Sequence, residues 1–211
     1  SVTVAPQIEV DFQNGIDRWV FVGTGRLLDE SDLATYGEQV QTMYGIRDGT
    51  VLEMGTSLPH KPRTDSGFEK ILDGLKGLSS APEKGWIHDL PKGERIIAPI
   101  QAEVNLLVYA GSLPPENECL SGLAANIYAR EFTRGASQLR ETDGGDFVES
   151  IYSKEGAVGV ELIKLYKGED ATQPTVRVAI TRGTDGKMTS FPVNLPGGSA
   201  QHRMSWRLLG Q

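Results

Sequence analysis

Gly23-Thr24-Gly25 is the first motif in the chain whose residue types could do chemistry, because it follows the apolar segment 19–22. A glycine-rich turn after a strand can bring backbone N–H groups close to the phosphates of a dinucleotide. That fingerprint needs a third glycine three residues later, at the start of a helix, and position 28 is Leu. We therefore interpret the motif as the glycine-rich end of a strand in an antiparallel β structure.

Two groups of oxygen-bearing residues resemble calcium ligands but have the wrong spacing. Asp11, Asn14 and Asp17 surround a turn, whereas an EF-hand loop places ligands at alternate positions and adds a later bidentate acid. The hairpin turn Asn14-Gly15 explains this group, and residues 143–146 (DGGD) are interpreted as a polar loop. The three histidines, at positions 60, 88 and 202, have no Cys or second His at a zinc-ligand spacing. The sequence predicts no metal site.

Residues that could form a catalytic group are also poorly placed. His88 and Asp89 are neighbours in a predicted strand, where successive side chains point to opposite faces, so they cannot act as a base and its orienting partner. The single cysteine, Cys119, has two acidic residues close before it and no basic neighbour that would favour the reactive thiolate. No serine lies in a G-x-S-x-G elbow. We predict no catalytic or cofactor-binding residue here, and therefore a protein that is not an enzyme.

The tryptophans allow two interpretations. Trp19, Trp86 and Trp206 lie in predicted strands and could form a carbohydrate-binding surface. One tryptophan in each group of strands is more simply explained by packing in an apolar core.

Composition limits the classes of protein that fit. The 211 residues include 21 Lys and Arg against 28 Asp and Glu, so the formal net charge is −7, which argues against a nucleic-acid partner. The longest apolar stretches, such as residues 106–110, are far shorter than the roughly 20 residues of a membrane span. The 25 Gly and 11 Pro predict frequent turns. The chain begins at Ser1 within a strand pattern, which is typical of a processed or excised segment.

Strand-like alternation of apolar and polar residues dominates the sequence. In the first dozen residues the apolar side chains fall on even positions, and Pro6 interrupts the pattern. Only residues 66–77 differ: they begin with a capping-box spacing, carry apolar residues at helical intervals and end at Gly77, which predicts one short helix. The predicted strands are 2–13, 19–22, 40–47, 85–90, 95–101, 105–110, 125–132, 157–166, 175–181, 188–193 and 202–208.

These strands fall into three groups, near residues 2–50, 84–132 and 157–208, with an insertion at 55–83. A spacing of about 40–50 residues between groups is typical of propeller blades, although barrels and sandwiches also have short strands at regular intervals. A propeller has four to eight blades, so three groups are too few to close a ring. We predict an all-β chain of antiparallel meanders that forms about three blades from the C-terminal part of a larger, modified β-propeller.

Several strings resemble the PilY/PilC family of type IV pilus tip-associated proteins. They occur in the family's order: WVFVGTGR at 19–26, SDL at 31–33, QTMYGIRD at 41–48, GWIHDLP at 85–91, GERII at 93–97 and RMSWRL at 203–208. The match continues through Leu113-Pro114 and Cys119, while residues 133–200 share only a strand-rich character. One departure is His88, where the family usually has Leu.

The resemblance implies a β-propeller displayed at the pilus tip, outer membrane or cell surface after export through the periplasm. Such proteins promote pilus assembly, oppose retraction, and mediate adhesion and twitching motility. The implied partners are minor pilins or other tip components and a host or abiotic surface. The family's calcium loop would lie before Ser1, so no residue here is assigned to a cofactor. The alternative is a fragment of a catalytic propeller such as a quinoprotein dehydrogenase, although no convergent acid, base or metal set favours it.

An incomplete propeller leaves blade edges without a neighbouring strand. We therefore expect the purified chain to self-associate, to exchange a strand or to bind a partner segment by strand addition. Light scattering would detect an assembly larger than one chain. A clean monomer whose first strand is fully protected in hydrogen exchange would contradict this expectation.

Overall fold

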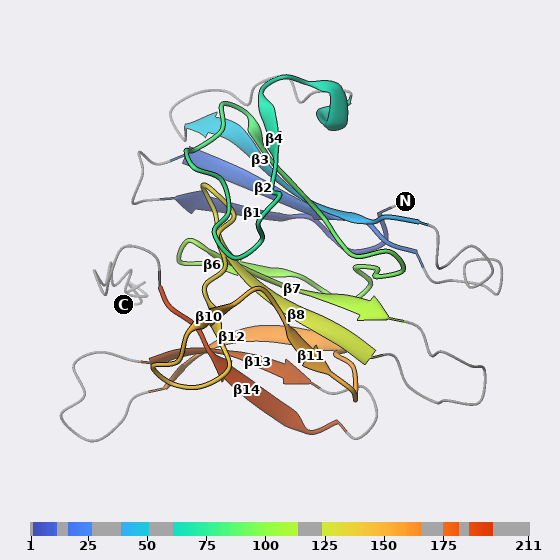
Figure 1. Cartoon of the computed structure of the whole chain (residues 1–211), viewed down its shortest axis with the longest axis vertical. Coiled ribbons are helices and arrows are strands. Elements are labelled where there is room, and N and C mark those ends of the chain that lie inside the picture. The colour runs from blue at the N-terminus through green and yellow to red at the C-terminus, as the bar shows by residue number, and fades with distance from the viewer. Residues whose placement is uncertain are drawn as a thin grey trace, which may run out of the picture.

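A computed structural model of the chain describes residues 2–11, 17–26, 39–50, 61–113, 124–165, 175–181 and 186–195. In these ranges the fold is almost entirely β, as the sequence predicts. Most strands lie in three open, mainly antiparallel sheets that are stacked one above another in Figure 1. The described strands form no closed barrel, which is consistent with a partial propeller. Within the same ranges no helix has the length and apolar character to cross a bilayer.

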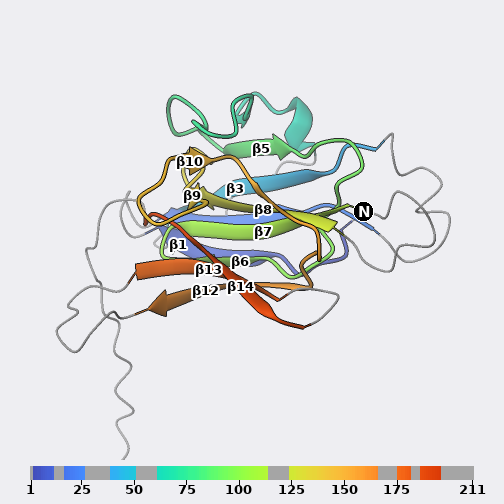
Figure 2. The ribbon, with the colours of Figure 1, turned by 60° about the horizontal axis from the view of Figure 1, so that its bottom comes forward.

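The first sheet has five strands in the order β1-β2-β3-β5-β4. All its pairs are antiparallel except β4 with β5, which run parallel. The strands are β1 (Gln7–Asp11), β2 (Asp17–Gly23), β3 (Thr42–Thr50), β4 (Phe68–Lys70) and β5 (Gly85–Asp89). Figure 2 shows the segment that includes β4, drawn in teal, at the outer edge of this sheet beyond β5.

The second and third sheets continue the antiparallel pattern, in the orders β11-β8-β7-β6 and β12-β13-β14. The second sheet contains β6 (Gln101–Glu103), β7 (Leu106–Leu113), β8 (Ala124–Glu131) and β11 (Ile151–Ser153). The third contains β12 (Gly159–Leu165), β13 (Thr175–Thr181) and β14 (Met188–Pro192). A separate ribbon pairs β9 (Leu139–Arg140) with β10 (Phe147–Val148), and η2 (Pro62–Thr64) is a 3-10 turn.

The second sheet is buried on both faces because its apolar side chains alternate between two cores. On β7, Leu107 and Tyr109 enter the core shared with the first sheet, whereas Leu106 and Val108 enter the core shared with the third sheet. The first core also holds Trp19, Phe21, Met43 and Trp86 from the first sheet. Two-sided burial explains why residues 106–110 form an uninterrupted apolar run.

A tight hairpin fixes the register of β6 and β7 and connects the first two sheets. Its two turn residues, Val104 and Asn105, have φ values of 52° and 61°, as a two-residue type I′ hairpin turn requires. The Asn105 side chain donates a 2.7 Å hydrogen bond to Asp11 Oδ1 at the end of β1. A positive φ strains a β-branched residue such as Val104, so the packed sheets must hold this turn in place.

Three strand predictions need correction. Strand β5, grouped by sequence with residues 84–132, pairs with β3 and belongs to the first sheet. Residues 95–101 form no continuous strand; Arg95 makes one isolated bridge to Ser112, and the strand begins only at Gln101. Strand β3 also continues past Asp48-Gly49 to Thr50, because the bulge in its pairing with β2 accommodates Gly49 at a φ of 83°.

The helix predicted at residues 66–77 is wrong. Phe68 begins β4 and is buried, whereas Leu72, which a helix would place on the same face, is 88% exposed. A single turn follows, in which Asp73 Oδ1 accepts the N–H groups of Leu75 and Lys76 and Gly77 ends it at a φ of 68°. The pairing of residues 68–70 with β5 therefore outweighs the helical spacing of the apolar residues. A helix would have needed Leu72 in its buried face, and the fold leaves Leu72 exposed.

Four predicted features lie outside the described residues. They are the turn Asn14-Gly15, the string SDL at 31–33, Cys119 and the strand 202–208.

The strand at Phe68 can be tested by a pair of substitutions. Phe68→Ala is expected to lower the free energy of unfolding by about 3 kcal/mol, because it empties a site between β3 and β5. Leu72→Ala should change it by less than about 0.5 kcal/mol, because that side chain is in solvent. Urea unfolding measures both values. Similar losses in the two variants would instead support the helix.

Candidate functional site

The glycine-rich motif is part of the packing, as the sequence interpretation proposes. Thr24 N donates to Thr42 O at 2.9 Å, and Ile96 N donates to Thr24 O at 3.1 Å. A Cβ atom on Gly25 would lie 2.6 Å from Ile96 N, so only glycine allows this approach. The backbone groups that would cradle a phosphate are therefore bonded to neighbouring strands.

His88 and Asp89 point to opposite sides of β5, as predicted. Asp89 accepts hydrogen bonds from Thr42 Oγ1 at 2.7 Å and from Arg63, and its ion pair with Lys70 Nζ is 2.8 Å long. Burial raises the pKa of Asp89, but the hydrogen bonds from Arg63, Lys70 and Thr42 outweigh it and hold the pKa well below its usual range. Asp89 therefore joins β3, β5 and the segment before β4 at the outer face of the sheet.

The His88 side chain enters a buried polar cluster between the first two sheets. Tyr109 Oη lies 2.8 Å from His88 Nδ1, and Arg130 Nη2 lies 2.9 Å from His88 Nε2. Because a guanidinium can only donate, Nε2 must be the acceptor and the proton of the neutral imidazole must be on Nδ1. Arg130 therefore fixes the tautomer of His88.

Arg130 is fully buried and connects five parts of the chain. Its Nε donates to Tyr109 Oη at 3.0 Å, and its Nη1 donates to the carbonyl oxygens of Gly74 and Gly135. The compensating charge is Glu149, whose Oε1 lies 3.5 Å from Arg130 Nη2. A Cβ atom on Gly74 would lie 1.8 Å from Oε1 of that carboxylate, so a larger residue here would displace the Glu149 side chain.

Glu94 forms the other end of this cluster and is also fully buried. Its Oε2 accepts a hydrogen bond from Tyr128 Oη at 2.9 Å, and its Oε1 accepts one from Asn126 Nδ2. Burial raises the pKa of Glu94 to about 7, although both hydrogen bonds oppose the shift. Burial also raises the pKa of Tyr109 to about 12.

The bonds of this cluster connect the first two sheets and leave its imidazole neutral. Burial lowers the pKa of His88 to about 4; the Glu149 carboxylate, whose Oε1 lies 3.7 Å from Nε2, opposes this shift and the charge of Arg130 adds to it. The imidazole is therefore neutral at pH 7 and both its nitrogens are bonded to the protein. A general base needs access to a substrate proton, which this arrangement does not offer.

Sequence reasoning missed this cluster because its members are spread over residues 88–149. A signal was present: His88, Arg130 and Glu131 lie in segments that otherwise form apolar strands. A charged residue within such a strand indicates a buried polar partner. The identity of the partner depends on how the sheets pack.

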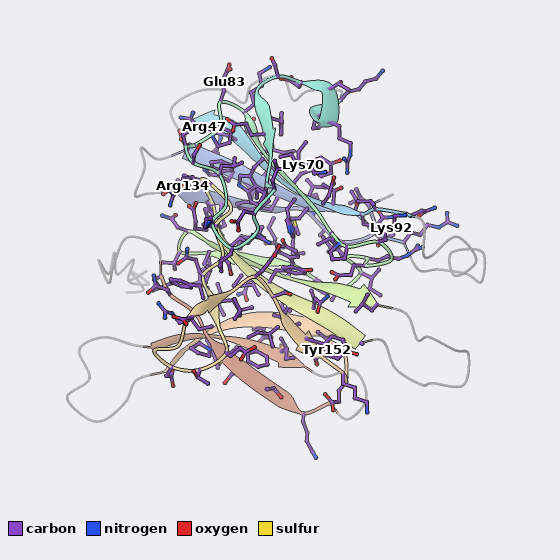
Figure 3. The ribbon with its side chains drawn as sticks, viewed as in Figure 1. Arg47, Lys70, Glu83, Lys92, Arg134 and Tyr152 are labelled. Carbon is purple, nitrogen blue, oxygen red and sulfur yellow. The ribbon has the colours of Figure 1, made fainter. Side chains whose placement is uncertain are left out.

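A cavity of about 280 Å³ opens at one end of the interface between the first two sheets. It is lined by Asp17 and Trp19 of β2, Arg47 of β3, Ala81, and Thr133 and Arg134 just after β8. Figure 3 shows Arg47 and Arg134 at the same end of the molecule. Asp17 Oδ2 accepts a 2.7 Å hydrogen bond from Arg47 Nε. This cavity is the candidate binding site.

Asp11 and Asp17, two of the residues considered as calcium ligands, lie opposite each other in the pairing of β1 with β2, but each has a partner within the protein. Asp11 is bonded to Asn105 and Asp17 to Arg47, while the segment 143–146 forms a mostly exposed turn between β9 and β10. Among the described residues, no three His, Cys, Asp or Glu side chains form a group that could hold a metal ion. His60, Cys119, His202 and Trp206 lie outside those residues. Trp19 and Trp86 are both packed in the first core.

The chain is similar to a protein from Xylella fastidiosa (strain Temecula1 / ATCC 700964) described as a type IV pilus biogenesis factor PilY1 homolog. The two are 27% identical over 207 residues, which cover 90% of this chain and 16% of that protein. The chain thus spans about a sixth of the length of this relative, and the match supports a PilY1-like relation. No family model matches the chain, and no solved structure matches it.

Three of the six strings that carry the pilus-family resemblance form adjacent strands of the first sheet. WVFVGTGR includes most of β2, QTMYGIRD most of β3, and GWIHDLP includes all of β5. Gly45 of the second string packs on Trp86 of the third, since a Cβ atom there would lie 2.4 Å from the indole ring. These three strings therefore supply residues of the first core.

Glu94→Gln is expected to change how stability depends on pH. Because folding raises the pKa of Glu94 from 4.5 to about 7, its contribution is fully present below pH 4.5 and is lost as the pH rises through 7. Gln does not titrate; its oxygen can accept from Asn126, and its amide N–H can donate to Tyr128 Oη in place of accepting from it. The unfolding free energy of the variant should therefore rise relative to wild type between pH 5 and 8. Urea unfolding at pH 5, 6, 7 and 8 measures this difference.

Glu69→Gln is the matched control, because Glu69 is exposed on β4. The unfolding free energy of this variant should change with pH in parallel with that of wild type. His88 titrates in the opposite sense, since its lowered pKa weakens the fold as the pH falls from 6.5 towards 4, but wild type and Glu94→Gln share that effect. A Glu94→Gln profile parallel to wild type would contradict the buried acid.

Proposed function

We propose that the chain is a segment of a type IV pilus biogenesis factor and acts as a binding module without catalytic activity. The observation that carries the proposal is the similarity to the PilY1 homolog along 90% of the chain, with the family-like strings side by side in β2, β3 and β5. A role that depends on a displayed β scaffold agrees with this distribution, because those three strings supply residues of the first core.

The absence of enzymatic activity is part of the proposal. The ionisable groups in the interior, His88, Glu94 and Arg130, are each bonded to other groups of the chain. A catalytic propeller such as a quinoprotein dehydrogenase would need acidic ligands and ring-stacking side chains around a ligand space. The residues lining the described cavity have a different character, with two guanidiniums beside one carboxylate.

In the proposed setting, the protein is exported through the periplasm to the pilus tip, outer membrane or cell surface. There it would promote pilus assembly, adhesion and twitching motility through contacts with minor pilins or other tip components and with a host or abiotic surface. The open sheets support contacts of this kind, because an unpaired edge can accept a strand from a partner.

The pilus role can be tested in the bacterium that carries this gene, provided that it makes type IV pili. Deletion of the gene is expected to reduce surface pili and twitching severalfold, and the intact gene should restore both. Pili sheared from the cells are measured by immunoblotting the major pilin, with total cellular pilin as the control. Unchanged surface pili in the deletion strain would refute the proposal, as would dye-linked alcohol oxidation by the purified protein with added quinone and calcium.

A further inference from the structure

The cavity at the end of the first two sheets is lined by a buried tryptophan and two arginines. Trp19 is 1% exposed and contributes to the cavity wall, and among the described residues its indole N–H has no hydrogen-bond partner. This nitrogen is itself buried, so the indole reports on events in the cavity without being a group that a ligand there would bond.

Each guanidinium at the cavity has one carboxylate partner, since Arg47 Nε binds Asp17 and Arg134 Nε lies 3.5 Å from Glu131 Oε1, so an anion would bind to the remaining Nη groups. The lining contains two guanidiniums, Arg47 and Arg134, and one carboxylate, Asp17. Asp17 uses Oδ2 to bind Arg47 Nε, which leaves the two Nη groups of that guanidinium for another acceptor within the described part of the chain. The planar fork of an arginine matches the two oxygens of a carboxylate.

The backbone of this rim is held in place before any ligand arrives. Glu131, which is buried behind the rim, accepts hydrogen bonds from Thr133 N at 3.0 Å, Thr133 Oγ1 at 2.6 Å and Arg134 N at 2.6 Å. On the opposite side, Arg47 N donates to Lys84 O at 2.8 Å. Binding therefore orders few additional groups, which reduces its entropic cost.

We propose that this cavity is a binding site for a single carboxylate group, held between the guanidiniums of Arg47 and Arg134 above Trp19. A volume of about 280 Å³ suits one small acidic group, such as an acidic side chain of a partner protein or one sugar acid. Carboxylate binding would not depend on the pilus role, because it follows from the lining residues alone.

The indole N–H of Trp19 provides a direct measurement. In a proton–nitrogen NMR spectrum the chain gives three indole signals, and Trp19→Phe identifies the one from Trp19. Titration with glutarate at constant ionic strength is expected to shift that signal and to saturate, whereas glutaramide, its neutral amide, should leave it in place. An equal response to glutaramide, or no response to glutarate, would overturn the proposal.

Arg134→Gln is the decisive variant, because Arg134 is half-exposed and its removal should leave the fold intact. It is expected to weaken glutarate binding about tenfold by removing one charged fork. Lys154→Gln, which removes an exposed positive charge from the turn after β11, is the matched control and should bind as wild type does. Equal affinities in the two variants would mean that general charge, and not this cavity, attracts the acid.

Two further probes separate the sources of the carboxylate. N-acetylglutamate amide represents an acidic side chain of a protein, and glucuronate represents a sugar acid. If one probe binds more tightly than glutarate, the group that it represents is assigned as the source of the carboxylate. That tighter binding must be lost in Arg134→Gln. If neither probe shifts the Trp19 signal, the proposal fails even if the gene deletion abolishes pili.

Discussion

The buried guanidinium of Arg130 is the interaction on which the arrangement of the first two sheets depends. It binds His88 of β5, Tyr109 of β7 and the carbonyl oxygens of two loops, and it faces Glu149 before β11. A buried charge without partners costs several kcal/mol, so the two sheets and both loops must take up this one arrangement together. The same geometry keeps His88 neutral and excludes it from acid–base chemistry.

Close backbone approach is the second constraint, and it explains the glycines of the family-like strings. Gly45 leaves room for Trp86, whose Nε1 donates a 2.6 Å hydrogen bond to Phe132 O, and Gly25 leaves room for the backbone at Ile96. The cavity opens just beyond this dense region, where the turn at Thr133 and Arg134 follows β8. The dense core therefore positions a rim whose guanidiniums remain available to a ligand.

The sequence predicted some features of the site correctly and missed others. It placed His88 and Asp89 on opposite faces and gave Gly23-Thr24-Gly25 a packing role, because both conclusions depend only on strand period and on a missing glycine. It did not place Arg134 beside Arg47, since 87 residues separate them. It misread residues 66–77 as a helix, because apolar spacing does not show which side chains will be buried: Phe68 is, and Leu72 is not.

The sequence by itself determined the all-β class and most strands between Trp19 and Pro192, because alternation and turn residues act between near neighbours in the chain. Only the tertiary structure decided that β5 joins β3, that β4 is a strand, and that Arg130 links five segments. Those outcomes depend on hydrogen-bond and charge partners supplied by distant parts of the chain. The buried acid Glu94 and the carboxylate-binding cavity arise in the same way, because burial and converging charges exist only once the sheets have packed.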